Sequence, residues 1–303
     1  MQDPDPNFRP VPGRPEPLGP GLRRVLAPNP SPMTFRGTNT YLVGTRDVAV
    51  IDPGPSDMTH LAAILSAVGA GRVTAILVTH AHLDHSPLAR PLGEATGAPV
   101  LAYGGPEAGR SAAMRHLASS GELGGGEGVD RTFRPDETLA DGDVVTGEGW
   151  SLRALHTPGH FGNHLSFAWD DILFTGDLVM GWASSLVSPP DGDLTDFMAS
   201  LDRISRSEWS VLYPGHGAPV AAPAARVSAL LTHRRARETA ILAALADGPA
   251  TPALLAARLY TETPRHLLPA AERNVLAHLV DLSSRALVAP AGALSAASEF
   301  GLT

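Results

Sequence analysis

The run His80-Ala81-His82-Leu83-Asp84-His85 is the feature that most restricts how this chain can fold. It brings three imidazoles and a carboxylate together directly after Val73–Thr79, a β-rich run. Protonated imidazoles so close together would repel one another, and neutral ones need partners for their ring nitrogens. A divalent metal ion resolves both problems by accepting the nitrogen lone pairs. The run therefore predicts a metal site at the end of a strand.

Three further short motifs carry ligand-type residues far from this run in the sequence. They are Thr157-Pro158-Gly159-His160, Thr175-Gly176-Asp177 and Pro214-Gly215-His216-Gly217. Each places a histidine or aspartate at the end of a predicted strand, beside a glycine that permits close backbone approach. A single histidine of this kind would be interpreted as an ordinary surface or core residue. The complete set, in this order, favours ligands that converge on one edge of the sheets.

The two residues after the first run predict the local structure there. Ser86-Pro87 is typical of a helix N-cap followed by the first helical turn. Asp84 and His85 are therefore predicted to lie where a loop enters a helix.

The composition excludes several other kinds of chemistry. The chain has no cysteine, so it can form neither a disulfide nor a thiolate metal site, and His, Asp or Glu must hold any metal. All 23 basic residues are arginines, which excludes a lysine Schiff base and a P-loop lysine. The formal net charge of −8 argues against general electrostatic binding of nucleic acid.

The sequence suggests neither a membrane-spanning segment nor an export signal. No apolar run approaches the roughly 18 residues that a membrane helix needs. The start, Met1–Pro6, lacks the basic residues and apolar stretch of a secretory signal. We therefore expect no membrane association and a cytoplasmic location. Nothing in the sequence predicts an oligomeric state.

The chain divides into three parts by composition. Residues 1–33 hold ten of the 28 prolines and are predicted to form an extended arm, with regular structure beginning at Thr40. Residues 34–223 contain strands that pair locally and then alternate with helices, which favours an α/β domain of mixed sheets covered by helices. Residues 224–303 are predicted to be helical, with helices over 225–246, 251–259 and 264–285.

Together the motifs resemble the metallo-β-lactamase fold superfamily. The resemblance extends upstream to Gly37–Gly44 and to Ile51-Asp52-Pro53-Gly54. It is strongest to the branch that contains glyoxalase II-type thioesterases and β-lactamase-like hydrolases with a winged-helix-like C-terminal domain. It implies an αββα sandwich with the metals at one edge of its two sheets, followed by a small helical, winged-helix-like domain.

The resemblance also implies a binuclear centre with seven ligands. One metal is held by His80, His82 and His160, a second by Asp84, His85 and His216, and Asp177 bridges the two. Asp52, just after a strand, would support the ligands. Zn²⁺ is the metal we expect for such donors, with Fe²⁺ and Mn²⁺ as alternatives. A metal-bridging hydroxide would be the nucleophile.

Three side chains are candidates for catalysis or substrate contact. Asp84 both ligates and can orient the nucleophile. His164, four residues after His160, is predicted either to support a ligand or to donate a proton. Trp182 lies in the segment 180–196, which follows the bridging ligand and should border the cleft. For Trp182, substrate contact and a structural role are both open.

Single residues separate the branches of this family. His82 stands where flavodiiron-type oxidoreductases carry an acid, and Asp177 stands where the antibiotic-degrading enzymes carry Cys or Ser. Both argue for a hydrolase that is not a true β-lactamase. Ser86–Ala89 replaces the small residue and two glycines usual in glyoxalase-like thioesterases, which argues against glutathione. A mono-iron sulfur dioxygenase is compatible with most of the same motifs.

We therefore predict hydrolysis of a small-molecule carboxylic ester or thioester. Phosphodiester cleavage, as in an endoribonuclease, is the alternative. It is supported by the winged-helix-like tail and by four arginines, Arg234, Arg235, Arg237 and Arg265. A hypothesis of another class makes the C-terminal domain a nucleic-acid-binding regulator, although a pure binder would have no use for an open bimetallic site.

Overall fold

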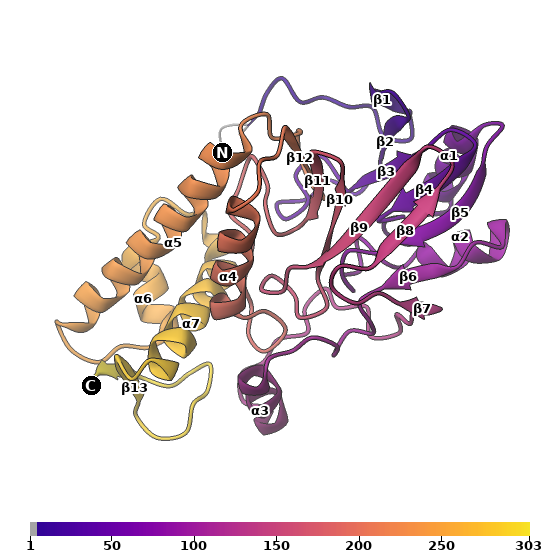
Figure 1. Cartoon of the computed structure of the whole chain (residues 1–303). Helices are drawn as coiled ribbons and strands as arrows, with labels where there is room; N and C mark the ends of the chain where they lie inside the picture. Colours follow the sequence, from indigo (N-terminus) through magenta and orange to yellow (C-terminus); the bar gives the residue numbers. More distant parts are fainter. Residues whose placement is uncertain (1–4) are drawn as a thin grey trace.

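Two β-sheets form the centre of the computed structural model, which describes residues 5–303 (Figure 1). Residues 1–4 belong to the predicted N-terminal arm and lie outside the described residues. The seven-stranded sheet contains, in this order, β1 (Glu16–Gly19), β2 (Leu22–Leu26), β3 (Asn39–Val43), β4 (Asp47–Ile51), β5 (Arg72–Leu77), β6 (Val100–Ala102) and β7 (Glu137–Thr138). The five-stranded sheet contains, in this order, β12 (Val211–Pro214), β11 (Ile172–Gly176), β10 (Leu165–Trp169), β9 (Trp150–His156) and β8 (Val144–Gly147).

Helices cover the outer face of each sheet. Helices α1 (Met58–Val68) and α2 (Ala89–Thr96) pack on the seven-stranded sheet, and α4 (Leu194–Ser205) and α5 (Pro223–Leu245) pack on the five-stranded sheet. Figure 1 shows these two pairs of helices on opposite sides of the sheets. The predicted αββα sandwich is therefore confirmed.

Alternating side chains explain why both faces of each sheet are buried. On β4, Val48 and Val50 contact the α1 and α2 layer, while Ala49 and Ile51 point into the core between the sheets. On β11, Leu173 packs toward α4 and Phe174 packs into the same central core. Because neighbouring residues of a strand point to opposite faces, such nearly continuous apolar runs suit strands covered on both sides.

Strand direction brings the predicted ligands to one edge of the sandwich. β4 and β5 are parallel, as are β11 and β12. β9 and β11 are both antiparallel to β10, so they run in the same direction as each other. The loops that carry the four ligand motifs follow the carboxyl ends of β5, β9, β11 and β12. Ligands separated by more than one hundred residues in the sequence therefore meet at the same edge.

The N-terminal arm departs from the prediction. Regular structure begins at β1 and β2 rather than at Thr40, so two short segments of the predicted arm are part of the seven-stranded sheet. Proline excludes a long helix but not a strand at a sheet edge, where a missing N–H costs no ladder hydrogen bond. Pro17 lies in β1, which is such an edge strand.

The predicted helix start at Ser86-Pro87 is also wrong. Helix α2 begins at Ala89, after Leu88, and no side chain caps it. The Ser86 hydroxyl donates instead to the Asp130 carboxylate at 2.8 Å. A stronger tertiary acceptor has therefore taken the side chain that would have capped the helix, and Asp84 and His85 lie in a turn before it.

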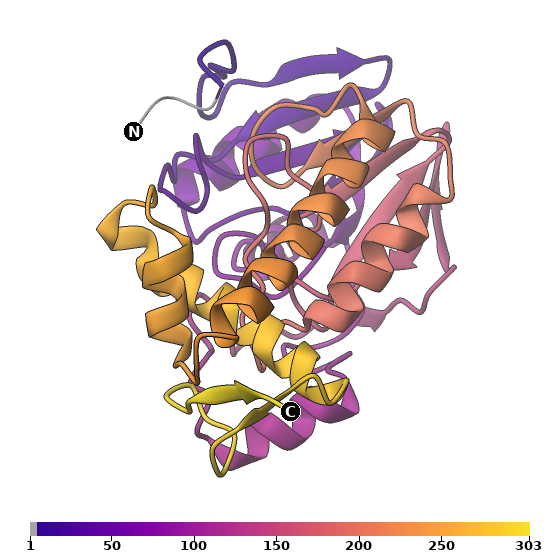
Figure 2. The same ribbon diagram turned by 90° about the vertical axis from the view of Figure 1, so that its left-hand side faces the viewer.

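The C-terminal part has its own core. It contains α6 (Pro252–Leu259), the short 3-10 helix η1 (Arg265–Leu267), α7 (Leu268–Ser284) and a hairpin of β13 (Val288–Pro290) and β14 (Phe300–Leu302). The three predicted helical regions are confirmed. α3 (Ala112–Ser120) packs against this part, with Met114 in the same apolar cluster as Leu276 (Figure 2). Among the helices of residues 5–303, none combines the length and apolarity that a membrane crossing requires.

Helix α5 belongs to two cores. Val227 and Leu230 pack on the five-stranded sheet, while Ile241 and Leu245 pack in the C-terminal core. Its first residue, Pro223, coincides with the composition change in the sequence. One continuous helix, which begins at the proposed domain boundary, therefore packs against both parts.

His278 of α7 provides a test of this C-terminal core. The side chain is buried, and neither ring nitrogen has a hydrogen-bond partner among the described residues. Burial, reinforced by Arg234, Arg237, His233 and Arg285, lowers the pKa of His278 to about 3. Since this is below the unfolded value of 6.5, the folded state binds fewer protons than the unfolded state between pH 6.5 and 3. His278 therefore lowers stability increasingly as the pH falls through that window.

We expect His278→Leu to stabilise the fold, and to do so more strongly in acid. The replacement removes an unsatisfied polar group, which costs about 1–3 kcal/mol. It also removes a proton-linked loss of roughly 2 kcal/mol at pH 5. Denaturant unfolding at pH 7.5 and pH 5 measures the free energy of unfolding and so separates these two contributions. His116→Leu, at an exposed position of α3, is the control. A stabilisation that is absent, or equal at both pH values, would contradict the expectation.

Candidate metal centre

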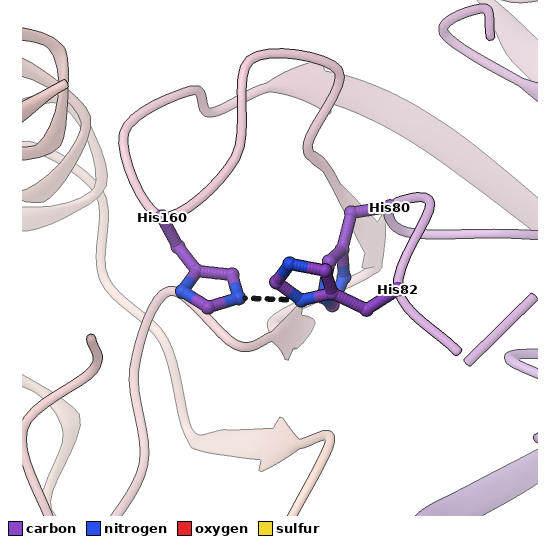
Figure 3. A group of neighbouring side chains, drawn as sticks. All are labelled: His80, His82 and His160. Atoms are coloured by element: carbon purple, nitrogen blue, oxygen red, sulfur yellow. Dashed lines mark hydrogen bonds between the residues drawn. The ribbon is translucent and has the colours of Figure 1, made fainter. Parts of the chain in front are cut away.

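The predicted ligands meet in three overlapping groups at the edge of the sandwich. The groups are His80, His82 and His160; Asp84, His85 and His216; and His80, His85 and Asp177. Within each group, one donor atom per residue lies within 4.8 Å of the others. Figure 3 shows the first group, in which rings from two separate loops point toward one another. All seven predicted ligands therefore come together.

Hydrogen bonds behind the first group determine which nitrogen each ring presents. Thr79 donates its hydroxyl to Asp52, so it accepts a hydrogen bond from Nδ1 of His80 at 2.9 Å. Nδ1 of His160 donates to the carbonyl of Leu186 at 2.7 Å. Both rings therefore carry their proton on Nδ1 and present the Nε2 lone pair. These two Nε2 atoms lie 2.9 and 3.1 Å from Nδ1 of His82.

The second group is arranged in the same way. Nδ1 of His85 donates to Asp52 at 2.9 Å, and Nδ1 of His216 donates to the carbonyl of Gly37 at 3.2 Å. Their Nε2 atoms face each other at 3.3 Å, and Nε2 of His216 lies 3.1 Å from Oδ2 of Asp84. Two lone pairs at this distance repel unless a proton or a metal ion lies between them.

Asp177 lies between the two groups. Its Oδ1 is 3.5 Å from Nε2 of His85, and its Oδ2 is 3.4 Å from Nε2 of His216 and 3.7 Å from Nε2 of His160. Oδ1 is buried without a hydrogen-bond partner among the described residues. A buried carboxylate oxygen without a partner is costly. Asp177 therefore lies within 3.7 Å of histidines from both groups.

Burial lowers the pKa of some histidines of the site, whereas the two carboxylates raise the pKa of others. Burial, with a contribution from His160, lowers the pKa of His82 to about 3. Burial also opposes protonation of His216, but Asp177 and Asp84 outweigh it and raise its pKa to about 9. Burial opposes ionisation of Asp177, but His216 and His85 hold the pKa of this carboxyl well below its usual range. The carboxylates are therefore ionised and can act as ligands.

The donor set fits divalent metal ions. Four imidazoles have a proton held on the outer nitrogen, Nδ1, so their Nε2 atoms point inward with the two carboxylates and can bind a metal ion that displaces any proton there. Histidine and aspartate donors without thiolate suit Zn²⁺, Fe²⁺ or Mn²⁺. Hydrogen bonds that set the tautomer of a ligand are typical of metal sites.

Asp52, which follows β4, contacts His85 of the second group directly and His80 of the first group through Thr79. It accepts hydrogen bonds from the backbone N–H and the hydroxyl of Thr79, each at 2.7 Å, in addition to that from His85. Its backbone has φ +50°, a left-handed conformation that is uncommon outside glycine. One buried carboxylate therefore orients the strand before His80 and the ring of His85.

His164 and Trp182 also lie at the site. His164 is fully buried: its Nε2 accepts the backbone N–H of Asp177 at 3.2 Å, and its Nδ1 donates to Thr157 at 3.0 Å. Trp182 is partly exposed and donates from Nε1 to the carbonyl of His216 at 3.2 Å. Both side chains therefore contact the backbone of a ligand.

A cavity of about 430 Å³ opens in front of the ligands. Its remaining wall is mainly apolar and comes from the N-terminal segment, the segment after Asp177 and the region where η1 meets α7: Pro32, Met33, Met180, Trp182, Leu186, Leu267 and Ala270. A second cavity of about 350 Å³ also borders His82 and His160 and continues past Glu127, Ser188 and Glu272. The cleft therefore lies between the metal centre and the C-terminal helices.

The sequence interpretation did not include Phe35. Its ring stacks between Phe8, at 6.1 Å, and Trp182, at 5.1 Å, and its backbone has φ +57°. A bulky residue in this conformation costs about 1–3 kcal/mol. No periodicity or motif around Phe35 predicts this, because the stack depends on partners 27 residues before it and 147 after it in the sequence.

Comparisons with known proteins agree with this geometry. Residues 33–216 match the family model of the metallo-beta-lactamase superfamily, and residues 251–295 match that of the beta-lactamase associated winged helix domain. An atrochrysone carboxyl ACP thioesterase of Aspergillus fumigatus is 32% identical over 278 residues, covering 84% of this chain and 79% of that protein. A beta-lactamase-like protein 2 homolog of Drosophila melanogaster is 32% identical over 284 residues, covering 86% of each.

The similarity extends to solved structures. A metallo-beta-lactamase family protein of Thermus thermophilus superposes with a TM-score of 0.76 at 29% identity, covering 95% of this chain and 100% of that one. The family match covers every predicted ligand, and the fold brings those ligands together with their donor atoms inward. The chain accordingly belongs to the metallo-β-lactamase superfamily and is a hydrolase.

Proposed function

We propose that this chain hydrolyses carboxylic thioesters at a binuclear metal centre. The observation that carries the proposal is the convergence of inward ligand atoms around Asp177, whose buried Oδ1 has no hydrogen-bond partner among the described residues. His80, His82 and His160 would hold one metal, Asp84, His85 and His216 the other, and Asp177 both. We propose Zn²⁺ as the metal, because histidine nitrogens and carboxylate oxygens are ligands that Zn²⁺ commonly binds in proteins.

The chain's own residues would orient the reactants. Divalent ions, when bound, supply Lewis-acid activation of a water molecule and of the acyl carbonyl. Asp84 is the ligand carboxylate most open to the cleft, with 27% of its side chain exposed against 10% for Asp177. It is therefore the residue that we assign to orient the attacking water. The apolar wall of Met33, Leu186 and Leu267 would exclude competing water and pack against the acyl group.

The leaving group favours a thioester over an alkyl ester. A thiol has a pKa near 8.5, so it leaves as a thiolate without a strong acid to protonate it. His164 is fully buried with both nitrogens engaged, which supports a positioning role for this residue rather than proton donation to a substrate. The Aspergillus fumigatus relative, which is named an ACP thioesterase, supports the same substrate class.

The arginines that supported phosphodiester cleavage do not line the cleft at the metal centre. Arg234 is buried, and Arg237 donates to the carbonyl of Leu259 while it covers the ring of Tyr260 at 4.0 Å. Glu127 instead adds a negative charge to the wall. None of the residues 5–303 that line the cavity of about 430 Å³ is an arginine, which supports an uncharged acyl group, rather than a nucleic acid backbone, as the part of the substrate that lies at the metals.

A substrate panel tests the proposal. It contains an acyl-CoA, an acyl-pantetheine, a glutathione thioester, a lactone, a simple phosphodiester, single-stranded RNA and a cephalosporin, each with zinc-loaded protein. Thiol release from the acyl-CoA or acyl-pantetheine is the expected positive result. The same panel is run with Asp177→Ala, which should lose the activity. Its matched control is Asp281→Ala, because Asp281 is a partly buried acid that binds Thr195 and Arg285 away from the cleft. Turnover of only the RNA or the phosphodiester would reject the thioesterase proposal.

A further inference from the structure

The segment Met180–Val187, which we call the support segment, contacts three of the proposed ligands. Nε1 of Trp182 donates to the carbonyl of His216 at 3.2 Å. The hydroxyl of Ser185 donates to the carbonyl of Asp177. The carbonyl of Leu186 accepts the hydrogen bond that sets the tautomer of His160. The position of this segment therefore determines how His160, Asp177 and His216 face the metals.

The support segment has no regular secondary structure to hold it in place. In residues 5–303, no backbone–backbone hydrogen bond involves Met180–Val187. Its buried polar groups are satisfied by side chains instead, as buried backbone groups must be. An irregular segment that relies on side chains for its conformation is sensitive to each of them.

Side chains from α5 and α7 supply those bonds. Arg226 donates to the carbonyls of Met180, at 2.7 Å, and of Ala183, at 2.5 Å. Arg234 donates to the carbonyl of Ser185 and, at 3.0 Å, to Oδ1 of Asn274 on α7. Oδ1 of Asn274 also accepts the backbone N–H of Val187 at 3.1 Å. Two helices after residue 223 thus clamp the segment at four points.

Burial of the Arg234 guanidinium costs more free energy than simple packing at this position would require. Its side chain is 2% exposed and lies 5.0 Å from the ring of Phe197. No carboxylate pairs with it among the described residues, so its burial is compensated only by a carbonyl, an amide oxygen and the ring. Burial lowers its pKa to about 10. A methionine would fill the same space without this desolvation cost.

We propose that Arg234 is a positioning residue that, with Asn274, fixes the support segment so that His160 and Asp177 are pre-organised for metal binding. The inference rests on the metal centre of the proposed function but not on its substrate. Among the described residues, the segment makes no hydrogen bond to the side chains of His80, His82 or His85; Thr79 orients His80, and Asp52 orients His85. Loss of Arg234 should therefore weaken metal binding selectively, through the ligands His160 and Asp177.

Metal affinity and a spectroscopic probe test the proposal in the full-length protein. Arg234→Met is compared with Arg237→Met, a matched control on the same helix whose arginine also donates to a carbonyl and covers a ring. Zn²⁺ affinity is measured by competition with a chromophoric chelator, and ligand geometry by the visible spectrum of the Co²⁺-loaded protein. Thermal unfolding of the metal-free proteins reports folding separately.

We expect Arg234→Met to bind Zn²⁺ about tenfold more weakly, in the range known for residues that support metal ligands. Its Co²⁺ spectrum should differ from that of the parent protein. Arg237→Met should stay within about twofold of the parent and keep its spectrum. Arg234→Lys keeps one donor and the charge, so it should recover part of the affinity.

Ser185→Ala is the second variant, because it removes the bond to Asp177 without disturbing α5. It should also weaken Zn²⁺ binding. If Arg234→Met does not fold, Ser185→Ala still tests whether the support segment positions the ligands. Affinities within twofold of the parent, with an unchanged Co²⁺ spectrum in both folded variants, would overturn the positioning role. Failure of the parent protein itself to bind metal would instead reject the proposed function.

Discussion

Asp177→Ala is expected to reduce kcat/KM for the preferred thioester by about 10³-fold or more. Loss of a group that merely supports a metal ligand already costs about 10–100-fold, and Asp177 faces both ligand groups at 3.4–3.7 Å from three histidines. The alanine variant would leave His85 and His216 facing each other with no carboxylate between the two groups. Steady-state kinetics with thiol detection, together with metal content by elemental analysis, measure the effect.

Two comparisons make this result specific. Asp177→Asn keeps the shape of the side chain but not its charge. This variant should therefore bind less metal than the parent protein while it remains folded. Asp281→Ala, the acid remote from the cleft, should keep its activity within a fewfold. An Asp177→Ala variant with nearly normal kcat/KM would show that the residue is not a ligand of the working centre, and the binuclear proposal would then fail.

Removing the metals is expected to abolish activity and to lower Tm by roughly 10 °C. A metal present at one thousand times its Kd stabilises the folded state by about 4 kcal/mol. For a chain of this size, 1 kcal/mol shifts Tm by about 2–4 °C. The physical source is the cluster itself, in which imidazole nitrogens and a buried carboxylate oxygen without a hydrogen-bond partner among the described residues converge on one place. Chelator treatment, calorimetry and re-addition of Zn²⁺ provide the measurement.

The chelator effect should depend on the ligands. Zinc-saturated chelator is the chemical control and should leave both Tm and activity unchanged. Asp177→Ala should show a much smaller chelator-induced shift than the parent, because it has less metal to lose. Full activity after exhaustive chelation, with metal content verified as negligible, would rule out a metal-dependent hydrolase.

The ligands could be predicted from the sequence because their signals are local. His80, His82, Asp84 and His85 lie in one short run, and His160, Asp177 and His216 each follow a strand next to a glycine. Strand-end position is readable from apolar patterning, and parallel strands bring such ends to one edge of a sheet. The helices after residue 223 were predictable for the same reason, because their apolar periodicity is local.

Other features could not be predicted because they depend on partners distant in the sequence. Phe35 adopts a left-handed backbone conformation against Phe8 and Trp182, and no neighbouring residue signals that stack. Ser86 looked like a helix cap until Asp130 competed for its hydroxyl. The segment 16–26 joined the seven-stranded sheet because β3 offered it an edge to pair with.

The sequence by itself therefore determined which donors this protein has, and that they lie at the ends of strands. Only the tertiary structure decided which nitrogen each histidine presents and what holds it there. The tautomers of His160 and His216 depend on the carbonyls of Leu186 and Gly37. The support segment depends on Arg234 reaching the carbonyl of Ser185. Backbone carbonyls are the same in every residue type, so no sequence pattern encodes which of them a side chain will meet.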